Sequence, residues 1–227
     1  MKNRTSLLTA TAVMLLLGNS SFAQQFEAVH AVQYESPDQA ETSIAALMQD
    51  DSMKDARVSL YAQTFGDYGS SHLVVEDFDS YEQYMSTTED RLASHAWSRY
   101  LLQTMSSDYR GSNLAIVVDD HGAPRHTAGY LAAFLIHTTD AATYRSAMAD
   151  LNKAIGNPGV LRLVAMRTGT RDHTHAVLIG AGDFKALNEY LDKLLASDAF
   201  ADFLKKVGET REVVAVNMYR RVGTWGD

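Results

Sequence analysis

Apolar residues recur along the chain with two different periods, one typical of helices and one typical of strands. Within residues 196–207 they fall at i, i+4, i+7, i+8 and i+11, which predicts a helix with one buried face. Residues 58–62 alternate apolar and polar, as in a strand with one covered face. Residues 114–118 and 131–136 are apolar on both faces, so we expect these strands to be covered on both sides.

A similar sequence pattern occurs twice in the chain. The segment Leu92–Leu101 reads LASHAWSRYL, and LASDAFADFL follows 103 positions later at Leu195–Leu204. The same spacing relates His72 to His175. A spacing that stays constant over most of the chain predicts two copies of one structural unit.

Each half is predicted to run strand, helix, strand, strand, helix, strand. In the first half the predicted strands are 26–34, 57–64, 72–76 and 114–118. One helix is capped by Ser36. A second helical region runs from about Asp77 to about Met105 and breaks near Ser94, which can cap its second part. In the second half the strands are 130–136, 161–168, 175–179 and 213–219; one helix is capped by Thr139 and ends at Asn157-Pro158-Gly159, and the other covers 184–207.

The first residues have the pattern of a secretory signal peptide. Lys2 and Arg4 precede the apolar run 7–17, and Ser21-Phe22-Ala23 is a small-residue cleavage site. The run is shorter than the roughly 20 residues that span a bilayer. We expect a signal peptide at 1–23, a periplasmic or secreted protein without membrane insertion, a first repeat at 24–118, a linker at 119–128 and a second repeat at 129–227.

Charge and cysteine content narrow the function classes. The chain carries a net charge of −8, which becomes −10 without Lys2 and Arg4. This balance repels phosphate backbones and argues against nucleic-acid binding. The chain has no cysteine, so its stability must come from burial rather than from disulfides.

The strands that are apolar on both faces need a second cover besides the helices, and the sheet of the other half can supply it.

The sequence pattern Tyr84-Met85 … Ser94-His95-Ala96-Trp97-x-x-Tyr100 resembles the antibiotic-biosynthesis-monooxygenase-like branch of the dimeric α/β-barrel superfamily. The second half departs from it with Asp198 in place of His95. The resemblance implies an α+β fold: two ferredoxin-like βαββαβ repeats whose antiparallel sheets pack into one intramolecular dimeric α/β barrel. We expect a monomeric pseudo-dimer or a homodimer.

Polar side chains on the second strands are the first candidates for a binding site. If helices cover the apolar face, the other face lines the space between the two sheets, where an unpaired polar group costs roughly 1–3 kcal/mol. The candidate ligand-binding residues on these strands are Ser59, Tyr61, Gln63, Arg162 and Met166, and His72 and His175 at the start of the third strands complete the set. The alternative is that Arg162 pairs with an acid and the other groups bond one another.

The resemblance implies a small, partly apolar ligand between the sheets and an oxidation that needs no bound cofactor. In that mechanism Arg162 stabilises negative charge, and His175 or Tyr61 handles protons. A second hypothesis is a non-enzymatic periplasmic binding or interaction module.

A third hypothesis is a metal-binding or haem-binding protein. On an extended strand His173 and His175 project from one face and make a weak metal-site candidate. Related ferredoxin-like units hold haem through an axial histidine, and the available residues are His30, His72, His95, His137 and His175. No haem motif accompanies them, and we expect no cofactor.

Overall fold

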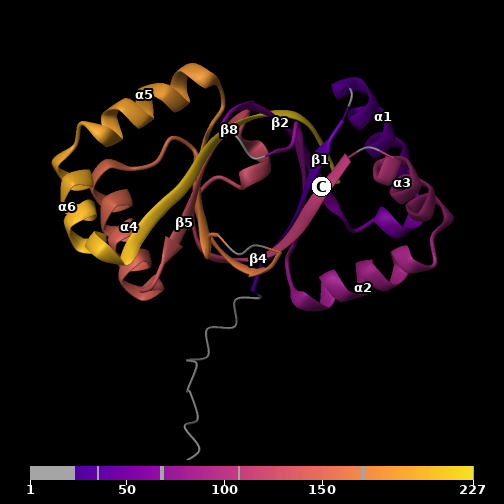
Figure 1. Cartoon of the computed structure of the whole chain (residues 1–227), viewed down its shortest axis with the longest axis horizontal. Helices are drawn as coiled ribbons and strands as arrows, with labels where there is room; N and C mark the ends of the chain where they lie inside the picture. The colour runs from indigo at the N-terminus through magenta and orange to yellow at the C-terminus, as the bar shows by residue number, and fades with distance from the viewer. Residues whose placement is uncertain (1–23, 35, 67–68, 107, 170–171, 227) are drawn as a thin grey trace, which may run out of the picture.

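The computed structural model describes residues 24–34, 36–66, 69–106, 108–169 and 172–226, in which two groups of helices lie on opposite sides of a central barrel (Figure 1). The signal peptide predicted at 1–23 lies outside the described residues and stays a prediction. Among the described helices, none combines the length and the apolar character needed to cross a membrane.

Both halves contain the predicted elements in the predicted order, except that the single helix predicted at 184–207 was wrong. It is interrupted at Ala196 and Ser197, because the Ser197 hydroxyl caps a second helix by accepting from the N–H of Phe200. The first half consists of β1 (Phe26–Gln33), α1 (Pro37–Leu47), η1 (Asp51–Met53), β2 (Arg57–Phe65), β3 (His72–Phe78), α2 (Tyr81–Leu92), α3 (His95–Ser106) and β4 (Asp108–Gly122). A short helix η2 (Arg125–Thr127) leads to β5 (Tyr130–Thr138), α4 (Ala141–Ile155), β6 (Val160–Thr168), β7 (His175–Ala181), α5 (Phe184–Leu195), α6 (Asp198–Val207), η3 (Gly208–Thr210) and β8 (Arg211–Trp225).

Side-chain caps set most of the helix starts. The Ser36 hydroxyl accepts a hydrogen bond from the backbone N–H of Gln39, and the Ser94 hydroxyl accepts one from Trp97 at 3.0 Å, as the sequence predicted. The prediction that Thr139 caps α4 was wrong. Asp140 is the cap, and its carboxylate accepts from the N–H of Thr143 at 3.0 Å.

Several strands run further than the sequence indicated, among them β8, which was predicted at 213–219 and covers Arg211–Trp225. The second helical region was expected to begin near Asp77, but β3 continues to Phe78 because Asp77 still pairs with Glu27 of β1 and Arg57 of β2. β4 likewise continues to Gly122 and pairs with β6 up to its end. Residues 119–122, predicted as part of the linker, are therefore strand.

The eight strands of the described chain form one closed barrel in the order β1-β3-β2-β8-β5-β7-β6-β4. The first-half and second-half sheets join where β2 pairs with β8 and where β4 pairs with β6, and both junctions are antiparallel. The two halves thus occupy the places of the two subunits of a dimeric α/β barrel. This arrangement confirms the predicted fold class.

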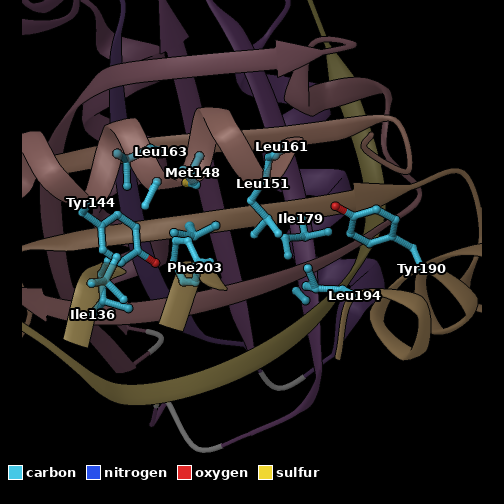
Figure 2. Packing of buried hydrophobic residues seen from close by; sticks show 14 of the residues in the cluster. Ile136, Tyr144, Met148, Leu151, Leu161, Leu163, Ile179, Tyr190, Leu194 and Phe203 are labelled. Atoms are coloured by element: carbon cyan, nitrogen blue, oxygen red, sulfur yellow. The ribbon is translucent and has the colours of Figure 1, made fainter. Parts of the chain in front are cut away.

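Each sheet has a face toward its own helices and a face toward the barrel interior. In the second half the helix side is one continuous apolar cluster in which Tyr144, Met148, Leu151 and Phe203 pack over the strands (Figure 2). In the first half Val58 and Leu60 belong to the corresponding cluster, as their alternation predicted. The barrel side holds smaller apolar clusters, which leaves two distinct places for a site.

Candidate functional site

Three charged or titratable side chains meet on the helix side of the first half. His30 and Glu76 project from the neighbouring strands β1 and β3, and Arg91 comes from the last turn of α2. His30 Nε2 lies 3.1 Å from Glu76 Oε1, and Arg91 Nη2 lies 2.5 Å from Glu76 Oε2. The Arg91 guanidinium also stacks over the Trp97 ring, 4.6 Å from its centroid.

Glu76 is a buried carboxylate that its neighbours keep ionised. It is 3% exposed, and burial alone raises its pKa. The hydrogen bond from His30 and the charge of Arg91 outweigh that effect and lower the pKa of Glu76 to about 2. Because an ionised carboxylate can only accept hydrogen bonds, His30 Nε2 carries its proton and donates a hydrogen bond to Glu76.

An apolar cavity of about 290 Å³ lies beside these groups, between the first-half sheet and helices α1 and α3. Its volume is close to the lower end of the range for small-molecule sites. His30 and Glu76 contribute polar atoms to a wall that is otherwise mainly apolar and aromatic; the apolar and aromatic lining residues are Val32, Ile44, Leu47, Met53, Val58, Val74, Trp97, Tyr100, Leu101 and Tyr109. The cavity can therefore hold a small apolar body and present His30 to it.

The second half has apolar residues at all of these polar positions. His30 pairs with Val74 across β1 and β3, as Phe134 pairs with Val177 across β5 and β7. Ser112 of β4, whose hydroxyl contacts His30 Nδ1, pairs with His30 as Val216 pairs with Phe134. By the same register and the matching helices, the equivalents of Glu76 and Arg91 are Ile179 and Leu194. The fold is thus built without the polar groups in one half. Their presence in the other half is specific to the cavity there.

The barrel interior holds a smaller cavity of about 70 Å³, closed at one end by a charged cluster. Glu27 Oε1 accepts hydrogen bonds from Arg125 Nε at 3.1 Å and from Arg162 Nη1 at 2.6 Å. Arg125 Nη2 also donates to Asp77 at 2.6 Å, and Arg162 Nη2 donates to Asp120 at 2.5 Å. A cavity of this size takes a few water-sized molecules rather than an aromatic ring system.

The structure places the predicted binding residues of the second strands in the barrel interior and toward its two ends. Tyr61 and Met166 line the interior cavity, and the Tyr61 hydroxyl accepts from Arg125 Nη1 at 3.0 Å. Arg162 lies in the charged cluster, so it pairs with acids, as the alternative interpretation held. Ser59 is buried opposite Thr224 near that end, and Gln63 donates to the carbonyl of Gly66 at the other end.

His72 and His175 are placed on the helix side rather than in the space between the sheets. His72 pairs with Val32, and His175 pairs with Ile136; both partners belong to helix-side clusters. Each imidazole Nδ1 bonds the hydroxyl of the preceding residue, Ser71 at 2.7 Å or Thr174 at 2.9 Å. The expected location of these two histidines was therefore wrong. An arrangement found in both halves indicates that they support the fold.

His173 and His175 do not face one another. The prediction of a common face assumed an extended strand through both residues, but β7 begins only at His175. His173 lines the barrel cavity, whereas His175 packs on the opposite side of the sheet. Among the described residues no group of three or more His, Cys, Asp or Glu side chains is placed to hold a metal ion.

Sequence reasoning missed His30 as a proton-transfer residue, and it missed Glu76 and Arg91 entirely. A signal for them was present in the repeat itself. When the two halves are aligned, Glu76 and Arg91 stand opposite Ile179 and Leu194 at the 103-residue spacing. A buried strand position that is charged in one copy and apolar in the other marks a site rather than a core requirement.

No protein-family model matches the chain, and no curated protein matches it in sequence. Solved structures match it in fold. A candidate monooxygenase from Fusobacterium nucleatum superposes with a TM-score of 0.61 at 10% identity, covering 91% of this chain and 96% of that one. An anthrone oxidase-like protein gives 0.60 at 11% identity, covering 91% and 94%. A heme-binding protein from Thermus thermophilus gives 0.52 at 9% identity, covering 88% and 92%.

The residues around the first-half cavity do not fit a haem group. Both ring nitrogens of His30 are engaged, Nε2 with Glu76 and Nδ1 with Ser112 at 2.5 Å, so neither is presented to an iron atom. A cavity of about 290 Å³ is also too small for a porphyrin. We derive no haem chemistry for this site.

Proposed function

We propose that the chain binds a small, largely apolar molecule in the first-half cavity and that His30 exchanges a proton with it. One observation carries the proposal. A hydrogen-bonded His30–Glu76–Arg91 group faces an apolar cavity in one half, while the equivalent positions of the other half are filled with apolar side chains.

The charges of the group suit proton transfer. Glu76 remains ionised because His30 and the positive charge of Arg91 stabilise its negative charge. The Glu76 carboxylate orients the imidazole by accepting a hydrogen bond from Nε2. His30 Nδ1 then carries the lone pair that can take a proton, with the Ser112 hydroxyl beside it. In this proposal the general base is His30 of the first half, rather than Tyr61 or His175.

The reaction class that we propose to test first is oxidation without a bound cofactor. The Ser112 hydroxyl would take a proton from a CH2 group of an aromatic substrate as it passes its own proton to His30 Nδ1. The resulting anion would combine with dioxygen to give a hydroperoxide, which loses water to leave a ketone. The likeness to an anthrone oxidase-like protein at the level of fold makes anthrone a reasonable probe. Its rings are apolar, and removing a proton from the CH2 group opposite its carbonyl gives an anion that is delocalised over the rings and the carbonyl oxygen.

The binding test compares two variants, each of which fills one of the two cavities with a larger side chain. Val74 lines the first-half cavity, and Ala133 lines the barrel cavity. We expect anthrone to quench the tryptophan fluorescence of the chain, to which Trp97 in the cavity wall contributes. V74F should abolish this saturable quenching, and A133L should leave it unchanged. Loss of quenching in A133L with retention in V74F would overturn the proposal in favour of the barrel interior.

The activity test measures oxygen consumption in the presence of anthrone. We expect the wild-type chain to consume oxygen and H30F, which carries the second-half residue, to do so at least about 100-fold more slowly. Saturable binding without His30-dependent turnover of anthrone would instead support a non-enzymatic binding module. In that case the proton-transfer part of the proposal fails for this substrate class.

Export is a separate proposal based on the first residues. We propose that residues 1–23 are a signal peptide and that the mature chain begins at Gln24. Intact-mass measurement of protein from the periplasmic fraction of an expressing Gram-negative host tests this. A chain that retains Lys2 and Arg4 there would contradict it.

A further inference from the structure

A serine completes a hydrogen-bonded row with His30 and Glu76. Ser112 of β4 is paired directly with His30 of β1, so both side chains project to the helix side. Ser112 Oγ lies 2.5 Å from His30 Nδ1, and His30 Nε2 lies 3.1 Å from Glu76 Oε1. The three groups come from adjacent strands in the order β4, β1, β3. This is the connectivity of a nucleophile, a base and a carboxylate that orients the base.

The proton positions follow from the charge on Glu76. The carboxylate accepts the proton on Nε2, which leaves the lone pair of His30 on Nδ1, toward the Ser112 hydroxyl. Arg91 holds the second carboxylate oxygen at 2.5 Å and so fixes the carboxylate. His30 can therefore accept the Ser112 proton while Glu76 stabilises the imidazolium that results.

The backbone beside Ser112 is irregular in a way that opens space there. The pairing of β1 with β4 shifts between Ala31 and Val32, and Arg110 is the extra residue in β4. Gly111 has φ +136°, and a Cβ built on it would contact nothing within 4 Å. The Tyr109 hydroxyl also contacts Ser112 Oγ, and Tyr109 lines the cavity. Ser112 does not itself line the cavity, but both side chains that its hydroxyl contacts, His30 and Tyr109, do, so the hydroxyl lies directly behind the cavity wall.

We propose that Ser112 is the nucleophile of an acyl-transfer site that hydrolyses uncharged esters of small apolar acids. The inference rests on the cavity of the proposed function but adds a different chemistry. Ser112 is absent from the equivalent place in the second half, where Val216 stands opposite Phe134. The fold therefore does not require a hydroxyl or an imidazole at these positions.

The reaction needs only the ester and water. Ser112 Oγ bonds to the carbonyl carbon while its proton moves to His30 Nδ1. The bond from that carbon to the alcohol oxygen then breaks, and the alcohol leaves with the proton from His30. Water next attacks the acyl-Ser112 ester, gives one proton to His30, and releases the acid as Ser112 regains its proton. The Tyr109 hydroxyl is placed to donate to the carbonyl oxygen as it becomes negative.

The experiment uses 4-nitrophenyl butyrate hydrolysis together with fluorophosphonate labelling and peptide mass spectrometry on the full chain. We expect label on Ser112, and we expect S112A and H30F each to reduce hydrolysis more than about 100-fold. Ser71 is the internal control, because its hydroxyl also bonds a histidine, but that histidine, His72, does not line the cavity, whereas His30 does. Ser71 should remain unlabelled in the same sample.

Several outcomes would overturn the proposal. They are absence of label on Ser112, equal labelling of Ser71 and Ser112, or hydrolysis that S112A leaves unchanged. Anthrone quenching of the tryptophan fluorescence in S112A separates this inference from the proposed function. If anthrone still quenches the fluorescence but Ser112 does not react, only the acyl-transfer proposal is overturned. If anthrone does not quench the fluorescence of the folded wild-type protein, the cavity proposal on which it rests is overturned as well.

Discussion

The Glu76 carboxylate and the Arg91 guanidinium lie 2.5 Å apart in the first half, at positions that Ile179 and Leu194 occupy in the second. Both members of the charged pair are buried, at 3% and 6% exposure. Desolvating a charged pair offsets much of its attraction, so an apolar pair of similar volume commonly serves stability as well or better. The second half shows that this fold accepts the apolar solution. The charged pair in the first half is therefore best explained by the cavity that it borders.

A first prediction exploits that internal comparison. E76I alone leaves the Arg91 charge buried without its partner, so we expect it to lower the free energy of unfolding by about 3–5 kcal/mol. The triple variant H30F/E76I/R91L copies the second half and should recover most of that loss. Urea unfolding followed by circular dichroism measures both. A triple variant no more stable than E76I would show that the first half depends on the charges for its own packing.

A second prediction concerns acid stability. The pKa of Glu76 is lowered from its usual 4.5 to about 2 by His30 and Arg91, which outweigh the effect of burial. A carboxyl with a lowered pKa stabilises the fold above its unfolded pKa and loses that contribution as the pH falls through its folded pKa. We expect the stability difference between wild type and E76Q to shrink by about 3 kcal/mol between pH 5 and pH 2. Thermal unfolding of both proteins across this range tests it, and a constant difference would contradict the assignment.

The architecture could be read from the sequence because its signals are local or repeated. The amphipathic stripe of residues 196–207 gave one helix, and the Ser36 and Ser94 caps placed two more. Strands that are apolar on both faces required a second cover, and the barrel supplies it. Asp140 displaced Thr139 as a cap because the side chain immediately before the first helical residue reaches the free N–H groups.

The site was harder to predict because it depends on strand register. His30 and Glu76 are 46 residues apart, and their contact exists only because β1 lies beside β3. Alternation correctly assigned Tyr61 to the barrel side, but it could not show that the larger cavity lies behind the other face. His173 was misassigned because the alternation rule holds only inside a strand, and β7 starts two residues later.

A third prediction uses the difference in packing between the two halves. Val74 borders the first-half cavity, whereas its equivalent Val177 lies in the continuous second-half cluster. V74F has about 290 Å³ of space to enter and should change the free energy of unfolding by less than about 1 kcal/mol. V177F has no such space and should cost about 1–3 kcal/mol. Equal costs in urea unfolding would mean that the first-half cavity is not available to a side chain.

The last prediction concerns the charged end of the barrel, where Glu27 accepts from both Arg125 and Arg162. Glu27 is 2% exposed, so E27Q leaves two buried guanidinium groups with less compensating charge, and we expect a loss of about 3–5 kcal/mol. D202N is the matched control, because it removes one carboxylate of the exposed Lys205–Asp202 pair and should cost less than about 1 kcal/mol. Urea unfolding measures the stability of both variants.

Because Glu27 belongs to β1, Arg162 to β6 and Arg125 to the segment between the halves, the loss in E27Q should appear as one cooperative transition. Separate unfolding of the halves in wild type, or an E27Q effect as small as that of D202N, would show that this cluster does not hold the halves together.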